Sequence, residues 1–355
     1  MTVTIAIVSG KGGTGKTTTA ISLACALGER DFNVLAVDMD PQANLTSGLG
    51  LNPYDPRETL FQVLTGDSGA GAAIVETAYD VDLLPSSPDF AAVESALPSR
   101  IGQELLLQRT LAALTHYDFV LIDTPPNFGF HTLNSLAAAD YILVPVQMSA
   151  YALKGLNEVQ RAMTAMRLEL NPKLQVLGVL PTFVSPRTNF SYDILSALRA
   201  LPDLRIFETQ VRTTVRFAET SLEGVPILRY AARSSAANAY RKLAGEVIAR
   251  TGMEVRSESV LAGPLAAPAP SQAAESPAWP VPAPLSTTGA LSVDAARLLG
   301  LEAAEERPEH PPPATSREAG PSGLAAANGS KDPRTGAMTT IMAALRRLIG
   351  RERSA

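Results

Sequence analysis

Residues 9 to 17, Ser-Gly-Lys-Gly-Gly-Thr-Gly-Lys-Thr, have the residue types and spacing of a loop that binds phosphate groups. The pattern G-x-x-x-x-G-K-T is met at every defined position from Gly10 to Thr17. Its glycines let backbone N–H groups turn toward phosphate oxygens, while Lys16 reaches the β- and γ-phosphates and the threonine hydroxyl faces Mg²⁺. The sequence therefore predicts a nucleotide site. Lys11 stands in the same loop and has no role in the pattern.

Three aspartates follow apolar runs elsewhere in the chain. Asp38 and Asp40 come directly after the run 34–37, and Asp123 follows the run 119–122. Ligands of open α/β sheets bind outside the carboxyl ends of the strands, where an aspartate can hold Mg²⁺ or its water shell. A turn or helix-cap role is the alternative. The phosphate loop in the same chain favours a catalytic interpretation.

The elements that must position these residues are strands alternating with helices. Strand-like apolar runs occur at 3–8, 34–37, 81–84, 119–122, 141–146 and 176–180. The segment 17–27 is rich in alanine and leucine at helical spacing, so strand, loop and helix come in the order that phosphate binding requires. Alternation of this kind implies parallel pairing and a sheet covered on both faces. We expect an α/β fold with a mostly parallel, doubly wound sheet.

The composition excludes several classes of protein. A chain of 355 residues with 46% hydrophobic residues can build a sizeable core. A single cysteine, Cys25, excludes intrachain disulfides and Cys-ligated iron–sulfur or zinc sites within one chain, and fits a reducing cytoplasm. No apolar run is long enough to span a bilayer, and Met1 leads directly into a strand instead of a signal peptide. The Asn-Lys-x-Asp motif of GTPases is absent.

The composition changes near residue 253, which predicts a domain boundary. Residues 1–252 form the nucleotide-binding domain, and residues 253–335, rich in Ala, Pro and Ser, are expected to be a disordered linker. Residues 336–350 place apolar side chains at helical spacing beside arginines, so we expect a basic amphipathic helix. Such a helix suits a membrane surface or a protein partner. Docking onto its own domain is the alternative, and residues 351–355 form a short tail.

Three segments carry a more specific pattern. They are Lys11-Gly-Gly-Thr-Gly-Lys-Thr-Thr18, Asp38-Met-Asp-Pro-Gln-Ala-Asn-Leu-Thr46 and Val120-Leu-Ile-Asp-Thr-Pro-Pro126. This ordered set resembles the ParA/Soj chromosome- and plasmid-partitioning ATPases of the MinD/ParA superfamily. The resemblance covers roughly residues 1–252. It implies the deviant Walker form of the P-loop, ATP and Mg²⁺ as cofactors, a homodimer formed on ATP, and weak hydrolysis without a partner.

The resemblance also implies a role for each residue of the site. The nucleotide would be bound by Lys11, Gly12, Gly13, Thr14, Gly15, Lys16, Thr17 and Thr18. Catalysis would fall to Lys11, Lys16, Asp40 and Asp123, and Mg²⁺ would be held, partly through water, by Thr17, Asp38 and Asp123. In the family the extra lysine crosses the dimer to the partner's nucleotide, so Lys11 is expected to act in trans. Gly12 would avoid crowding at the dimer interface, Thr18 would contact the α-phosphate, and Asp40 would position the attacking water.

A basic segment is the candidate for DNA binding. Residues 181–252 hold ten basic and six acidic side chains, although the whole chain has a formal net charge of −5. Such a segment can also be a solvated face. Relatives bind DNA without sequence preference through this region, which implies Arg212, Arg216 and Arg233 here. The implied partner is a ParB-like centromere-binding protein, and the implied location is the nucleoid.

Three departures and one alternative qualify this interpretation. Relatives often have Pro-Arg-Asn where this chain has Arg212-Thr-Thr214, and a second arginine where it has Ser235. An acidic residue common before Tyr151 is also missing. The alternative is a MinD-like ATPase that uses residues 336–350 to bind membrane. The segment Asp38-Met-Asp-Pro-Gln42 resembles the partitioning branch, so positioning on DNA is the expected function and positioning on membrane remains the alternative.

Overall fold

A computed structural model describes residues 2–55, 57–97, 102–149, 151–185, 189–200 and 204–254. The linker predicted up to residue 335, the helix at 336–350 and the tail at 351–355 lie outside the described residues. Within those ranges, none of the helices is long and apolar enough to cross a membrane.

The centre of the fold is a seven-stranded sheet with the order β3-β4-β2-β5-β1-β6-β7. Its strands are β1 (Val3–Ile7), β2 (Val34–Asp38), β3 (Val75–Glu76), β4 (Asp82–Leu84), β5 (Phe119–Asp123), β6 (Tyr141–Gln147) and β7 (Gln175–Thr182). All neighbouring strands pair in parallel except β3, which is antiparallel to β4. The predicted α/β class and mostly parallel sheet are confirmed. The six predicted runs are strands, whereas β3 was not predicted.

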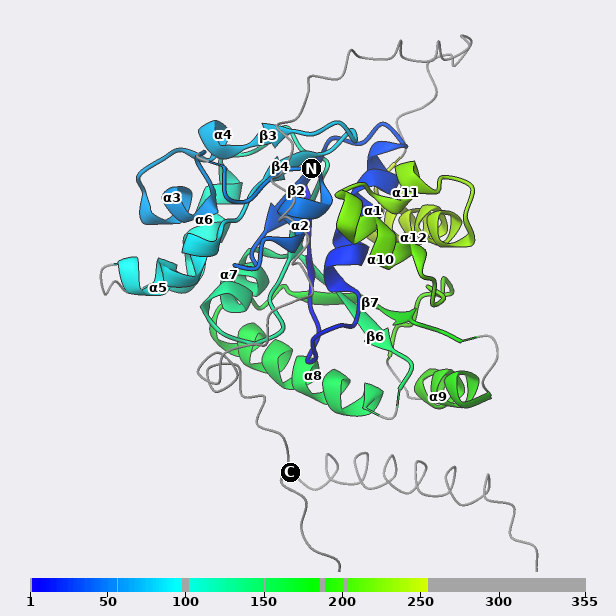
Figure 1. The fold of residues 1–355 in the computed structure, drawn as a ribbon. Helices are drawn as coiled ribbons and strands as arrows, with labels where there is room; N and C mark the ends of the chain where they lie inside the picture. The colour runs from blue at the N-terminus through cyan, green and yellow to red at the C-terminus, as the bar shows by residue number, and fades with distance from the viewer. Residues whose placement is uncertain are drawn as a thin grey trace, which may run out of the picture. The chain divides into compact units, whose positions relative to one another are not determined.

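Helices cover both faces of this sheet (Figure 1). They are α1 (Lys16–Gly28), α2 (Asn44–Gly48), α3 (Leu60–Thr65), α4 (Ala70–Ala73), α5 (Val93–Ala96), α6 (Leu106–Ala112), α7 (Phe130–Ala138), α8 (Ala152–Glu169), α9 (Asn189–Arg199), α10 (Arg216–Glu223), α11 (Ile227–Tyr230) and α12 (Ser235–Thr251), with short 3₁₀ turns at Pro88–Ala92 and Gln103–Leu105. One apolar core joins the sheet to α3 and α5–α8, and a second joins its other face to α1, α11 and α12.

The central strands are buried along their whole length because both faces are covered. Strands β1, β2 and β5 contain no exposed residue, and successive side chains alternate between the two cores. Register places Asp38, at the end of β2, beside Asp123, at the end of β5, and Asp123 beside Ile7 of β1. The sheet therefore brings the phosphate loop and two of the predicted aspartates to one edge.

Candidate nucleotide site

The phosphate loop connects β1 to α1 and needs glycine at two positions. Gly13 has φ +73° and Gly15, which caps the N-terminus of α1, has φ +89°. Residues with a Cβ atom rarely adopt this left-handed region. The loop consequently turns sharply enough to direct its backbone N–H groups, together with the helix N-terminus, at an anion.

Hydrogen bonds hold this loop in shape without a ligand. The Thr14 hydroxyl donates to Ser9 Oγ at 2.9 Å, and the Ser9 hydroxyl donates to the Lys11 carbonyl at 2.8 Å. From the end of β7, the Thr182 hydroxyl donates to the Thr14 carbonyl at 2.9 Å. The loop is therefore fixed both internally and against the sheet. Neither Ser9 nor Thr182 was predicted to take part, because neither belongs to the phosphate-binding pattern.

Gly10 lies directly against α8. A Cβ atom built at this position would lie 2.6 Å from Glu158 Oε2 and 2.8 Å from the Gly155 carbonyl oxygen. These distances leave no room for a side chain. Gly12 differs, since a Cβ there would meet only the Pro126 side chain at 3.8 Å. Any crowding at Gly12 must come from a second chain, so the predicted role of Gly12 in the dimer stays a prediction.

Lys16 and Asp123 form the buried charged centre of the site. Lys16 is only 7% exposed, and burial lowers the pKa of its ammonium, although the carboxylates of Asp123 and Asp40 oppose that shift. Asp123 accepts a hydrogen bond from the Thr17 hydroxyl at 2.6 Å. Its other oxygen, Oδ1, is buried and has no hydrogen-bond partner within the described part of the chain.

The unpartnered oxygen of Asp123 fits a Mg²⁺ site. Burial, followed by the nearby Asp38 carboxyl, raises the pKa of Asp123 well above its usual value, so the ionised form calls for a compensating positive charge. Hydroxyl and carboxylate oxygens are the ligands that Mg²⁺ prefers in nucleotide-binding proteins. Thr17 and Asp123 therefore supply a suitable donor pair, and the metal role predicted for both rests on this geometry.

Asp38 differs from Asp123 because protein donors already form hydrogen bonds to both of its carboxyl oxygens. Oδ2 accepts from the Thr46 backbone N–H at 2.8 Å and from the Thr46 hydroxyl at 2.7 Å. Oδ1 accepts from the Asp40 backbone N–H at 3.2 Å. Burial raises the pKa of Asp38 to about 7 despite these bonds. A direct Mg²⁺ contact would have to replace one of them, so the water-mediated metal role stays a prediction.

Asp40 lies close to this centre. Its side chain is 7% exposed, and Oδ1 accepts from the Gln42 backbone N–H at 3.0 Å. Its charge acts on the buried Lys16. The structure thus brings the predicted water-positioning residue to the same edge of the sheet as the phosphate loop and Asp123. Thr18, the residue predicted at the α-phosphate, follows in the first turn of α1 and lines a neighbouring groove.

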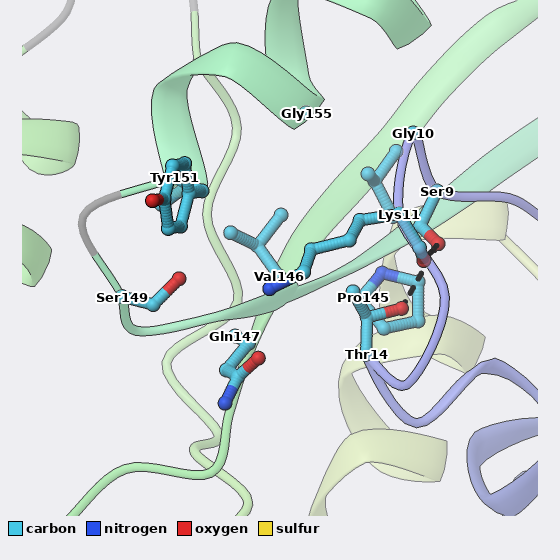
Figure 2. A pocket seen from close by; sticks show the side chains of 12 residues that line it. Ser9, Gly10, Lys11, Thr14, Pro145, Val146, Gln147, Ser149, Tyr151 and Gly155 are labelled. Carbon is cyan, nitrogen blue, oxygen red and sulfur yellow. Dashed lines mark hydrogen bonds between the residues drawn. The ribbon is translucent and has the colours of Figure 1, made fainter. Parts of the chain in front are cut away.

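Lys11 is exposed, and its side chain lies against its own chain. Its Nζ atom is 5.4 Å from the centre of the Tyr151 ring, within the range of a cation–π interaction. Figure 2 shows the side chain extended past Val146 in a pocket bordered by Ser149 and Tyr151. No carboxylate pairs with Lys11 among the residues that the structure describes. Tyr151 was not predicted as a contact of this lysine, since the two come from distant segments.

Two of the three arginines predicted to bind DNA line one hollow. Arg216, at the start of α10, and Arg233, before α12, border a hollow of about 490 Å³ that also includes Ser234, the N-cap of α12. Helix N-termini and arginines both favour phosphate groups. Arg212 is exposed but does not line this hollow.

Several other basic residues of the same segment have structural partners. Arg199, Arg229 and Arg241 pair with Glu208, Asp80 and Glu29 at 2.7, 2.6 and 2.6 Å. Arg250 donates to the backbone carbonyls of Leu177 and Ile206. Four arginines of this segment are therefore engaged in contacts within the fold. For Arg212, Arg216 and Arg233 no ion pair is found in the described ranges, so these three remain available to an anion.

Comparison with known proteins agrees with this geometry. The family model described as an AAA domain matches residues 2–176. The chromosome partitioning protein ParA of Caulobacter vibrioides is 36% identical over 250 residues, which are 69% of this chain and 94% of the relative.

Two solved structures are also similar. Cobyrinic acid a,c-diamide synthase from Mycobacterium smegmatis, with bound ADP and magnesium, is 35% identical with a TM-score of 0.64, covering 71% of this chain and 96% of that one. The septum site-determining protein MinD from Pyrococcus horikoshii, complexed with Mg-ADP, is 30% identical with a TM-score of 0.59, covering 71% and 98%. With the phosphate loop and the aspartates at one sheet edge, these matches show that the chain belongs to the ParA/Soj family of the MinD/ParA superfamily of ATPases.

Proposed function

We propose that this protein is an ATP-driven switch that positions DNA-borne cargo, working as an ATP-bound homodimer. The observation that carries the proposal is the Thr17–Asp123 hydrogen bond, beside which the second Asp123 oxygen has no partner among the residues that the structure describes. This arrangement provides a Mg²⁺ site at the phosphate loop, as a P-loop ATPase requires. ATP and Mg²⁺ are accordingly the ligands of this site, and hydrolysis to ADP and phosphate is its reaction.

The residues of the site divide the work of hydrolysis. The backbone of the phosphate loop and Lys16 hold the β- and γ-phosphates, and Mg²⁺ at Thr17 and Asp123 would neutralise charge on their oxygens. Asp40 orients a water molecule for attack on the γ-phosphorus, after which the bond from that phosphorus to the bridging oxygen breaks and ADP leaves. Hydrolysis is expected to be weak in the monomer, because no arginine lines either pocket beside the phosphate loop in the described part of the chain.

Dimerisation depends on Lys11. This lysine is exposed, has no carboxylate partner in the described part of the chain and lies within cation–π range of the Tyr151 ring. An exposed cation–π contact is worth only about 0.5–1 kcal/mol, so Lys11 can leave it at small cost. The γ-phosphate of ATP bound by a second chain offers a stronger partner, which makes ATP a condition for the dimer.

DNA binding is supported by the hollow at Arg216 and Arg233. It combines two guanidinium groups that form no ion pair within the described ranges with the N-terminus of a 17-residue helix, and phosphate contacts of this kind carry no sequence information. We place the ATP-bound dimer on the nucleoid in the cytoplasm. A ParB-like centromere-binding protein would stimulate hydrolysis and return monomers to solution.

A MinD-like function on membranes is the second candidate. The similarity to a solved MinD structure and the amphipathic pattern of residues 336–350 support it. The higher identity to a chromosome partitioning protein favours DNA.

Cosedimentation of the full chain with plasmid DNA and with anionic liposomes, each with ATP and with ADP, tests both functions. We expect ATP-dependent pelleting with DNA, and no pelleting of Lys16→Ala under any condition. Pelleting with liposomes alone would reject the DNA function and leave the MinD-like one.

A further inference from the structure

The segment from Asp38 to Thr46, which connects β2 to α2, carries Asp40 on a turn held at both ends. At its start, the Asp40 N–H donates to Asp38 Oδ1 at 3.2 Å. Inside it, the Ala43 N–H donates to the Asp40 carbonyl at 2.9 Å, and Ala43 has φ +52°. A left-handed backbone is unfavourable for alanine, so the turn keeps this shape only if its ends are held.

Thr46 holds the far end through three hydrogen bonds. Its backbone N–H and hydroxyl both donate to Asp38 Oδ2, and its hydroxyl oxygen accepts from the Ser86 backbone N–H at 3.0 Å. All three residues are fully buried, with no exposed surface. One hydroxyl therefore joins the end of β2, the start of α2 and the segment that follows β4. No other side chain among the described residues makes this junction.

The same contacts give two neighbouring carboxyl groups, those of Asp38 and Asp123, different surroundings. Asp38 and Asp123 are register partners on β2 and β5, so two buried carboxyl groups meet at one edge of the sheet. Thr46 satisfies Asp38 from within the protein, whereas Asp123 keeps one oxygen without a partner in the described chain. Asp123 can therefore contact a metal directly, whereas the oxygens of Asp38 are engaged in holding the turn.

We propose that Thr46 is a positioning residue: through Asp38 it fixes the turn that places Asp40 for hydrolysis, while taking no part in nucleotide binding. The inference rests on the proposed role of Asp40 in orienting water. Thr46 is not among the residues of the phosphate loop, so its loss should affect the rate of hydrolysis and spare the affinity for ATP.

The test uses Thr46→Val, which keeps the shape of the side chain and removes the hydroxyl. Misplacing a catalytic group slightly costs up to about 100-fold in rate, so we expect kcat to fall by roughly 10- to 100-fold. The Kd for a non-hydrolysable ATP analogue should stay within about twofold. Thr46→Ser restores the hydroxyl and should recover most of the rate. Ser86→Ala is the matched control, because Ser86 contributes its backbone N–H and its hydroxyl has no hydrogen-bond partner in the described part of the chain.

Three outcomes would overturn the inference. They are a Thr46→Val rate within about twofold of wild type, a Thr46→Ser variant as slow as Thr46→Val, and a loss of analogue affinity that parallels the loss of rate. If Thr46→Val does not fold, Thr46→Ala takes its place under the same criteria. Asp40→Ala is measured alongside: normal turnover there would reject the water-positioning role in the proposed function, whereas slow Asp40→Ala with normal Thr46→Val would reject only this inference.

Discussion

The two lysines of the phosphate loop differ in burial, and this difference decides what each substitution removes. Lys16 is buried beside Asp123 and Asp40, so Lys16→Ala should abolish nucleotide binding. Lys11 is exposed and lies near the Tyr151 ring, so Lys11→Ala should bind nucleotide normally as a monomer and fail to dimerise with ATP. Equilibrium binding and size-exclusion chromatography with ATP measure both effects. Normal dimerisation of Lys11→Ala would refute the trans role.

The raised pKa of Asp38 also predicts that the stability of the folded protein depends on pH. The pKa of Asp38 is raised to about 7, compared with about 3.9 in an unfolded chain. Between these values the folded protein keeps a proton that the unfolded chain has lost, so the free energy of unfolding should fall as pH rises from 4 to 7. The loss from this group is at most about 4 kcal/mol.

Denaturant unfolding without nucleotide or Mg²⁺ measures this slope. Asp38→Asn is the comparison, because the amide stays neutral and should flatten the decline over this window. An identical decline in wild type and Asp38→Asn would assign the dependence to another group, with Asp123 the first candidate because its pKa is also raised.

Helix α10 and the turn before α12 carry the arginines proposed to bind DNA, and the salt dependence of binding tests them. If Arg216 and Arg233 contact phosphates, replacing each with alanine should weaken binding to all sequences alike and reduce the salt slope by about one unit. Arg199→Ala is the control, since Arg199 is paired with Glu208 at 2.7 Å. ATP hydrolysis without DNA should be unchanged in all three variants. A slope equal to that of wild type would place the DNA elsewhere.

Local elements could be predicted from the sequence, whereas contacts between distant segments could not. The strands and α1 follow from apolar runs and spacing, and the aspartates follow from the ends of those strands. The short antiparallel β3 has too few residues for a periodic signal. Bonds such as Thr182 to Thr14 and Arg250 to Leu177 join residues far apart in the chain, and no local pattern reports them.

At the scale of the whole molecule, all predicted site residues and both apolar cores lie within residues 2–254. A chain ending at residue 254 should therefore hydrolyse ATP and bind DNA as the full chain does.

Deletion of residues 336–355 alone should likewise spare both activities and change localisation or recruitment of a partner. ATPase assays, DNA pelleting and fluorescence microscopy measure these properties. A fall of several degrees in the melting temperature on deletion would instead show that the segment docks on the domain.

The close packing of Gly10 against α8 couples the position of the phosphate loop to the position of that helix. The loop touches the Gly155 carbonyl and Glu158 too closely for even a methyl group to intervene. We expect a displacement of the loop toward α8 to reach the first turns of that helix. Because α8 has 18 residues and is about 27 Å long, a rotation that begins at Gly155 would displace Glu169 at its far end.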